Sequence, residues 1–231
     1  MTLPTIILPG YLAGAIEYQD LEHSLGSLGI PATIVPIRWQ DWIPTLGGRS
    51  VAPILHQIDR AVKAVLETSG TEKVNLVGHS AGGWLARIYL GEKAYCIHPK
   101  DTEDCRWYAR PYVHTLVTLG TPHTSQERWT RKNLDFVNQT YPGAFYDDVR
   151  YVCVAGKAIF GDRFKSWLAY SSYKLTCGSG DRWGDGITPI EAAHLAGAEN
   201  LIVEGAKHSP RSGRVWYGSP GLIEQWTKYL A

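Results

Sequence analysis

Short apolar runs alternate along the chain with longer amphipathic stretches, and this alternation indicates the architecture. The apolar runs are rich in β-branched residues, as strands are. They are Thr5–Leu8, Thr33–Ile37, Val74–Val77, Val113–Leu119, Tyr151–Ala155 and Asn200–Val203. Strands separated by helical segments of this length favour a mostly parallel sheet of about six strands, with right-handed crossovers and helices on both faces. We therefore expect an α/β protein.

Helical spacing is clearest between the second and third strands. Apolar side chains recur there every three or four residues through 50–70, and Gly70 ends the segment. Residues 15–29 show similar spacing and also stop on glycine. Two further helices are predicted, one over Ser80–Leu90 directly after the third strand and one over Gly221–Leu230 near the end of the chain.

Two segments, at about 123–150 and 157–184, interrupt this alternation. Both are rich in polar, aromatic and glycine residues, and both have weak periodicity. Long inserts in a compact domain are more often lids or substrate loops than accidents, so we expect that role for both. A chain of 231 residues can bury one large core, and we expect a single domain over residues 1–231.

The charge of the chain is almost balanced. There are 23 Lys and Arg residues against 22 Asp and Glu residues, and they are scattered, which gives no electrostatic basis for binding nucleic acid. No apolar run approaches the ~18 residues that span a bilayer. The first strand begins right after Met1, which leaves no room for a secretory signal. We expect a soluble, cytoplasmic protein whose contact with membranes is at most transient and at the surface.

The pattern of cysteines and histidines indicates neither a metal nor a cofactor. None of the four cysteines forms C-x-x-C, and neither H-E-x-x-H nor a G-x-G-x-x-G after a strand is present. Cys96 and Cys105 flank a polar loop and could pair if oxidised, although free thiols are favoured in a reducing compartment. Cys153 lies in an apolar run and is expected to be buried.

The strongest chemical signal follows the third strand. Gly78-His79-Ser80-Ala81-Gly82 matches G-x-S-x-G between an apolar strand and a helix. Where a buried strand turns directly into a helix, the corner residue is strained and side chains two positions away on either side would collide. A tight turn whose serine caps the helix is the alternative, but it does not explain both glycines. Ser80 is therefore predicted to be an exposed nucleophile, with the first helical amides pointing toward it.

A serine hydroxyl needs a base to take its proton. His208 follows the last strand, at the edge where ligands bind to open parallel sheets, and is the favoured base. His123 also lies just after a strand and is its rival. His79 is expected to pack under the turn, and His56 and His194 lie on helical patterns that are typical of structural histidines.

A carboxylate is needed to orient that histidine. Asp185 is held between two glycines in the segment GDGITPI, where a following threonine and proline can set the turn. We favour it over Asp181, which lies a short way back in the same loop and would aim elsewhere. Asp162 is a third choice.

Aromatic residues are frequent in the loops that follow the strands. Several of the nine tryptophans could line an apolar mouth there, although ordinary packing accounts for at least half of them. The candidate pocket residues are Trp39, Trp42, Trp84, His123, Trp129 and Trp183. Such a rim favours an apolar small-molecule ester as substrate, with lipids included.

Five segments of the chain resemble the α/β-hydrolase superfamily, and in detail its compact lipase and esterase branch, which includes inositol-deacylase-like lipases. They are ILPGYLAG, LVGHSAGG, LVTLGTPH, GDGITPI and VEGAKHSP, and they span nearly the whole chain. The chain order Ser80, Asp185, His208 is also that of the superfamily. The resemblance implies an α/β-hydrolase fold in which the first strand corresponds to the superfamily's third, so that its two opening strands are missing.

The resemblance also implies an oxyanion hole made of backbone amides, one from Ala81 and one from Tyr11 or Leu12. It implies hydrolysis of a carboxylic ester through an acyl-enzyme on Ser80, with no cofactor. Two alternatives stay open at this point. The same triad could cleave a thioester or an amide, or the protein could be a hydrolase-like receptor that retains a small molecule.

Overall fold

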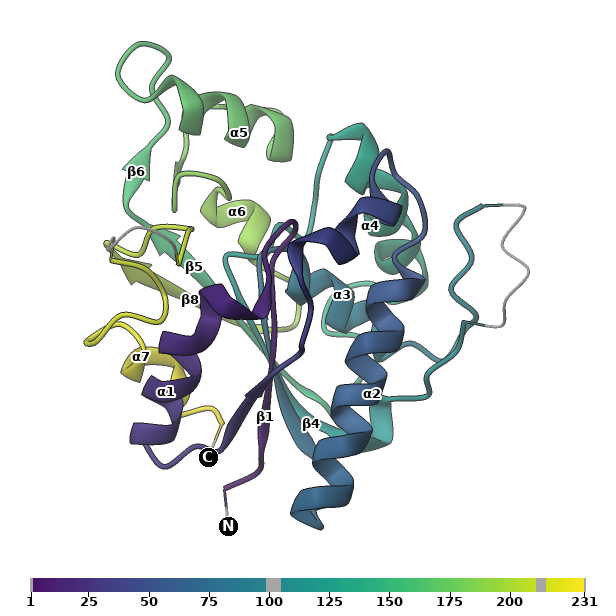
Figure 1. Cartoon of the computed structure of the whole chain (residues 1–231). Coiled ribbons are helices and arrows are strands. Elements are labelled where there is room, and N and C mark those ends of the chain that lie inside the picture. The colour runs from purple at the N-terminus through teal and green to yellow at the C-terminus, as the bar shows by residue number, and fades with distance from the viewer. Residues whose placement is uncertain (1, 99–104, 211–214, 231) are drawn as a thin grey trace.

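A parallel sheet forms the centre of the computed structural model, which describes residues 2–98, 105–210 and 215–230. Its six strands lie in the order β2-β1-β3-β4-β5-β8, and every neighbouring pair is parallel (Figure 1). The strands are β1 (Thr5–Leu8), β2 (Ala32–Ile34), β3 (Val74–His79), β4 (Val113–Leu119), β5 (Arg150–Lys157) and β8 (Glu199–Glu204). No antiparallel strand joins this sheet within the described residues. The predicted parallel sheet of six strands is confirmed.

Helices cover both faces of the sheet (Figure 1). The α-helices are α1 (Gln19–Ser27), α2 (Ala52–Ser69), α3 (Ala81–Tyr89), α4 (Arg128–Thr140), α5 (Trp167–Cys177), α6 (Ile190–Ala193) and α7 (Glu224–Thr227). Three short 3-10 helices span Ala15–Tyr18, Trp39–Thr45 and Arg110–Tyr112. Within the described residues, none of these helices has the length and apolar character that crossing a bilayer requires.

Two apolar cores form because successive strand residues point to opposite faces. Leu76 packs with α2, α3 and α4 on one face, and its neighbour Val77 packs with α1 and the C-terminal segment on the other. Both side chains are fully buried. Cys153 also lies in the first core, as expected, with 1% of its surface exposed.

Strands β3, β5 and β8 run one or two residues beyond their predicted bounds, and three other elements differ for a local reason. The second strand ends at Ile34 instead of Ile37, because Pro36 has no N–H to donate to a neighbouring strand. The last helix is α-helical only over Glu224–Thr227, since Gly221 has a φ of 81° and later residues form tighter turns. The helix after β3 begins at Ala81, which leaves Ser80 outside it.

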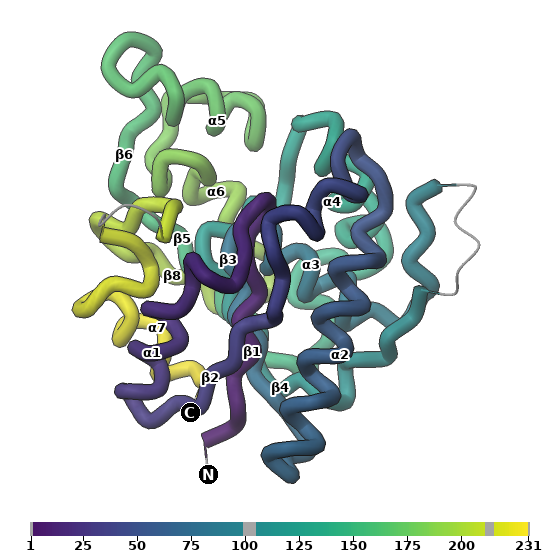
Figure 2. The backbone as a smooth tube through the Cα atoms, in the orientation of Figure 1, coloured from purple at the N-terminus to yellow at the C-terminus, as the bar shows by residue number. Residues whose placement is uncertain are grey.

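The two inserts contain regular helices that their weak periodicity did not predict. In the first insert, the Glu127 carboxylate accepts hydrogen bonds from the N–H groups of Trp129 and Thr130, at 2.8 Å each, and this cap begins α4. Helix α5 lies in the second insert, beside the short antiparallel pair β6 (Ile159–Phe160) and β7 (Trp183–Gly184). Figure 2 shows α4 and α5 well apart at the end of the sheet where the strands finish.

Candidate active site

Ser80 lies at the corner between β3 and α3. Its φ of 51° and ψ of −121° are rarely adopted by a residue with a side chain, and its N–H donates to the Leu119 carbonyl at 2.9 Å. A Cβ atom on Gly78 would lie 2.5 Å from the nitrogen of Gly83, and one on Gly82 would lie 2.3 Å from the Leu8 carbonyl oxygen. Neither position therefore has room for a side chain, so both positions of the motif must be glycine.

The structure brings Ser80, His208 and Asp185 into one hydrogen-bonded chain. The Nε2 atom of His208 lies 3.0 Å from the Oγ atom of Ser80, which is 128 positions away in the sequence. The Nδ1 atom of the same ring lies 2.7 Å from Oδ2 of Asp185. The backbone N–H of His208 also donates to the Asp185 carbonyl at 3.0 Å, so the two loops are joined twice.

Asp185 is buried, with 2% of its surface exposed. Its Oδ1 atom accepts from the N–H groups of Ile187 at 2.9 Å and Thr188 at 2.7 Å. Burial by itself raises the pKa of Asp185, but the charge of His208 and the hydrogen bonds around the carboxylate outweigh burial and lower the pKa. Asp185 is therefore an anion that faces the imidazole.

Tyr217 also belongs to this cluster, although no motif or spacing in the sequence identified it. Its hydroxyl donates to Oδ2 of Asp185 at 2.7 Å and accepts from the N–H of Gly156 at 2.9 Å. Burial and the charge of Asp185 hold the pKa of Tyr217 well above its ordinary value. The phenol therefore remains a proton donor and holds the same carboxylate oxygen that faces His208.

A second buried chain of hydrogen bonds starts at the loop after β1. The Gly10 N–H donates to the Tyr18 hydroxyl at 2.8 Å, and that hydroxyl lies 2.7 Å from Nδ1 of His79. The Nε2 atom of His79 lies 2.8 Å from the His208 carbonyl oxygen. Burial, followed by the charge of His208, lowers the pKa of His79 to about 3, so its ring is neutral and carries one proton.

Only one assignment of protons satisfies this second chain. The His208 carbonyl can only accept, so the ring proton of His79 lies on Nε2, and Nδ1 accepts the proton of the Tyr18 hydroxyl, whose oxygen accepts from Gly10. The Nε2–H group of His79 then donates to the His208 carbonyl. Three segments that surround Ser80 are tied together in this way, and His79 packs beneath the turn as the sequence predicted.

A small cavity of about 170 Å³ opens at Ser80. The loop of Tyr11 and Leu12 forms one wall, and His208 and Ser209 form another. Leu12 has a φ of 58°, which is uncommon for a residue with a side chain. Ala81, the first residue of α3, is buried beside the corner, and the first amides of a helix have no acceptor within the helix.

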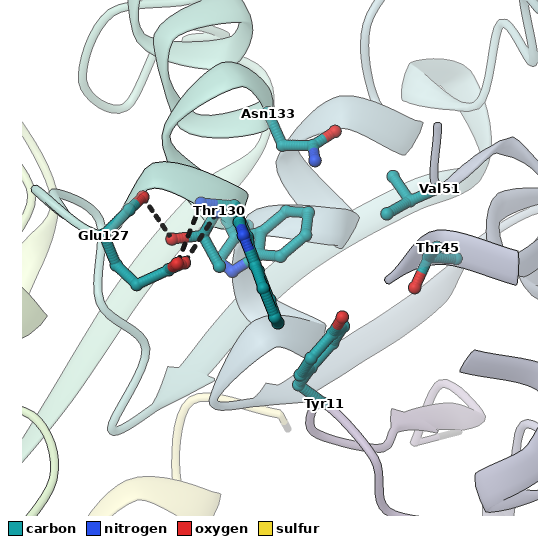
Figure 3. Close-up of a pocket in the computed structure, with 8 residues that line it drawn as sticks. Tyr11, Thr45, Val51, Glu127, Thr130 and Asn133 are labelled. Carbon is teal, nitrogen blue, oxygen red and sulfur yellow. Dashed lines mark hydrogen bonds between the residues drawn. The ribbon is translucent and has the colours of Figure 1, made fainter. Parts of the chain in front are cut away.

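Two larger cavities flank this central one. A cavity of about 360 Å³ lies under α4 and shares Tyr11 with the central cavity. Figure 3 shows Tyr11 and Thr45 facing the first turns of α4 across it. A cavity of about 440 Å³ lies under α5 and shares His208 and Ser209 with the central cavity.

Two of the predicted pocket residues, Trp84 and Trp129, line the cavity under α4. Trp42 is fully buried, and its indole N–H donates to the Ala13 carbonyl at 2.9 Å, so it is a packing residue. Trp39 is 56% exposed and borders a separate hollow beside Ile16.

The remaining candidates line none of these three cavities. Trp183 contacts Phe160 edge to face. His123 is 1% exposed, with Nδ1 3.4 Å from Arg87 and Nε2 3.3 Å from the Thr118 hydroxyl. Its ring is therefore held within the core.

The two alternative acids hold other loops in place. Oδ1 of Asp162 accepts from the N–H groups of Phe164 and Lys165, at 2.8 Å each, and Asp181 bonds to the Ser179 hydroxyl. Within the described residues, no group of three or more His, Cys, Asp and Glu side chains is arranged to hold a metal ion.

Residues 44–143 match a family model described as a PGAP1-like alpha/beta domain. This segment includes β3, the corner at Ser80 and α3. No curated protein matches the chain.

Several solved structures are similar over almost the whole chain. The mature form of the lipase BlEst2 from Bacillus licheniformis is 18% identical over 100% of this chain and 92% of its own, with a TM-score of 0.69. The lin2722 gene product of Listeria innocua is 14% identical over 100% and 94%, with a TM-score of 0.54. MGS-MChE2, an alpha/beta hydrolase enzyme from the metagenome of lagoon sediments of Mar Chica, Morocco, is 16% identical over 99% and 92%, with a TM-score of 0.51.

The parallel sheet, the corner at Ser80 and these matches lead to one conclusion. The chain has the fold of the α/β-hydrolase superfamily and resembles its lipase and esterase branch.

Proposed function

We propose that this protein is a serine hydrolase that cleaves carboxylic esters. Ser80 is the nucleophile, His208 is the general base, and Asp185 orients the imidazole. The observation that carries the proposal is the chain of contacts from the Ser80 hydroxyl to His208, at 3.0 Å, and on to Asp185, at 2.7 Å, beside an open cavity. In serine hydrolases, a serine, a histidine and a carboxylate from distant parts of the chain form the same two hydrogen bonds at similar distances.

The first half of the reaction forms an acyl-enzyme. The Oγ atom of Ser80 attacks the ester carbonyl carbon while its proton passes to Nε2 of His208. The carbon–oxygen bond to the alcohol then breaks, and the same proton moves from Nε2 to the leaving oxygen. Asp185 stabilises the imidazolium that forms between these two steps, because its carboxylate is ionised and lies against Nδ1.

The second half releases the acid. Water takes the place of the alcohol, gives a proton to His208, and attacks the acyl carbon. The bond to Ser80 then breaks, and the proton returns to Oγ. In both halves, negative charge develops on the carbonyl oxygen, and we assign the N–H groups of Ala81 and of Tyr11 or Leu12 to bind it. This assignment is supported by the close approach of the two loops, since a Cβ atom on Gly10 would lie 3.0 Å from Cβ of Ser80.

The cavities support an apolar ester as substrate. Trp84, Val51 and Tyr11 contribute to the cavity under α4, and apolar side chains of α5 line the cavity on the other side. The two inserts form the outer walls of these cavities, which supports the proposal that they are substrate-binding segments. The cytoplasmic location, the single domain and the lack of nucleic-acid binding stay predictions.

A thioester or an amide could react through the same residues, and a panel of acyl substrates with one acyl chain separates these bonds. A receptor that retains its product would show one turnover only. Repeated turnover of a short-chain aryl ester therefore distinguishes an enzyme from a receptor.

Labelling with an alkyl phosphonate tests the assignment directly, because such probes react with an activated serine. We expect one labelled peptide, which contains Ser80, and no label in Ser80→Ala. Ser27→Ala is a matched control, since Ser27 is an exposed serine that bonds only to its own helix. A label on another residue, or labelled Ser80→Ala protein, would refute the proposal.

A further inference from the structure

The cavity under α5 lies on the side of the site where the alcohol must leave. It shares His208 and Ser209 with the cavity at Ser80, whereas the cavity under α4 shares only Tyr11 with it. The two outer cavities therefore approach the reacting carbon from different directions. One begins at the imidazole, and the other begins at the loop after β1.

The direction of proton transfer assigns a different part of the ester to each cavity. When the bond between the acyl carbon and the alcohol oxygen breaks, that oxygen takes the proton carried by Nε2 of His208. The leaving oxygen must lie within hydrogen-bond distance of Nε2 at that moment. The rest of the alcohol then extends past His208 into the cavity under α5, and the acyl chain extends past Tyr11 into the cavity under α4.

The walls of the cavity under α5 are apolar, with two amines at its border. Ile159, Trp167, Leu168 and Ile187 supply apolar surface, and Lys165 and Lys207 are the lysines among the lining residues. Lys165 is exposed, and Lys207 is half-buried. In the part of the chain that the structure describes, no carboxylate lies within ion-pair distance of either amine, but Lys165 lies near Asp162, whose pKa its charge helps to lower.

Asp185 is the carboxylate that also borders this cavity. Its side chain is fully buried and accepts hydrogen bonds from Ile187, Thr188, Tyr217 and His208. These hydrogen bonds hold its oxygens against the imidazole, the Tyr217 hydroxyl and the neighbouring backbone, and among the described residues no ion pair joins it to either lysine. An alcohol bound here meets an apolar surface first and positive charge at the border.

We infer that the cavity under α5 binds the alcohol part of the substrate, and that this alcohol combines an apolar body with an anionic group held by Lys165 and Lys207. This inference rests on the proposed ester hydrolysis at Ser80. It names a substrate class, the esters of anionic amphipathic alcohols.

Three butyrate esters with one acyl chain and different alcohols test the inference. The alcohols are benzyl alcohol, its para-sulfonate and its para-trimethylammonium derivative. Each kcat/KM is divided by the rate of hydroxide hydrolysis of the same ester, which removes the intrinsic reactivity of the alcohol. At low salt, we expect the wild-type protein to favour the sulfonate over the trimethylammonium ester by about tenfold.

The variants connect this preference to the two amines. In the double variant Lys165→Gln, Lys207→Gln, the ratio between the two charged esters should fall to near one. Lys174→Gln is the matched control, because Lys174 is an exposed lysine of α5 that does not line the cavity. Its ratio should equal that of the wild-type protein.

The outcomes separate the two proposals. If Ser80 turns over the esters but the wild-type ratio is near one, or the ratio survives in the double variant, the inference about the alcohol is wrong and ester hydrolysis stands. If none of the three esters is cleaved and Ser80 takes no phosphonate, the proposed function fails and the inference fails with it.

Discussion

Tyr18→Phe removes a single oxygen atom from the buried chain that joins three loops of the site. The Tyr18 side chain is fully buried, and its ring contacts His79 and Trp216. Phenylalanine keeps those ring contacts. The substitution deletes the hydroxyl that is the partner of the Gly10 N–H, at 2.8 Å, and of Nδ1 of His79, at 2.7 Å.

The expected loss of stability follows from these two contacts. A buried polar group left without a partner costs about 1–3 kcal/mol, so we expect a loss of roughly 2–4 kcal/mol in the free energy of unfolding. For a domain of this size, each 1 kcal/mol lowers Tm by about 2–4 °C, so Tm should fall by roughly 5–15 °C. Tyr89→Phe is the matched control, since Tyr89 is also fully buried but its hydroxyl donates only to Asp59, at 3.1 Å. It should lose less than half as much.

The same variant should lower the catalytic rate. Gly10 begins the loop that carries Tyr11 and Leu12, and its amide is held against the corner through Tyr18. Because an oxyanion contact strengthens in the transition state, its misplacement should reduce kcat by about tenfold or more and change KM little. Tyr89→Phe should keep the wild-type kcat.

Thermal unfolding by circular dichroism and steady-state hydrolysis of an aryl butyrate measure both effects. A Tyr18→Phe protein with wild-type Tm and kcat would refute the claim that this hydroxyl supports the site. Equal losses of kcat in the two tyrosine variants would mean that the chain through His79 has no special role. A fall in Tm with unchanged kcat would limit Tyr18 to folding.

Three further predictions concern the corner, the acid and the buried imidazole. Asp185→Asn should lower kcat by ~10³-fold or more. Asp181→Asn is the control and should keep the wild-type kcat, because the Asp181 carboxylate bonds to Ser179 and not to the imidazole. A near-normal kcat in Asp185→Asn would exclude Asp185 from the triad. Gly82→Ala should prevent stable folding, because its Cβ would lie 2.3 Å from a carbonyl oxygen. Gly26→Ala is the control, since its Cβ would have no atom within 4 Å, and it should stabilise α1 by about 0.5–1 kcal/mol. The urea concentration at the midpoint of unfolding, measured on soluble protein, tests both variants. The pKa of His79 falls from 6.5 to about 3 on folding, so the unfolded chain binds the extra proton between these values. The folded protein is therefore destabilised through His79 as the pH falls from 6.5 toward 3, by up to about 1.4 kcal/mol per pH unit, and this loss is absent above pH 6.5. Urea titrations between pH 7.5 and 5 give the free energy of unfolding at each pH. The slope of that free energy against pH should differ between the wild-type protein and His79→Gln by the equivalent of about one proton.

The local constraint around Ser80 could be read from the sequence, while the catalytic roles of the site residues stay predictions. The spacing of glycines around Ser80 follows from backbone sterics at a strand-to-helix corner, and the structure leaves no room for a Cβ at either glycine. The selection of His208 and Asp185 used a weaker rule, that loops after parallel strands meet at one edge of the sheet. Their contacts with each other and with Ser80 have the geometry that this rule anticipated.

The pocket residues could not be separated by the same means. Trp42 and Trp84 both follow strands, yet Trp42 is tied to the Ala13 carbonyl and Trp84 lines a cavity. The direction in which a loop side chain points depends on what packs against it, and that information lies elsewhere in the chain. The helix α4 was missed because most of its residues are polar, although its few apolar residues do recur at helical spacing and Leu134 and Val137 are buried.

The amino-acid sequence by itself determined the six strands of the parallel sheet, the helices α1, α2 and α3, and the strained corner at Ser80. These depend on the alternation of apolar residues with periods of two and about 3.6, and on steric limits within a few residues. Only the tertiary structure decided that Tyr217 holds Asp185, that Tyr18 and His79 join the loops, and that two cavities open on either side of the serine. These contacts join positions that are far apart in sequence, so they arise from packing of the whole chain and leave no local pattern.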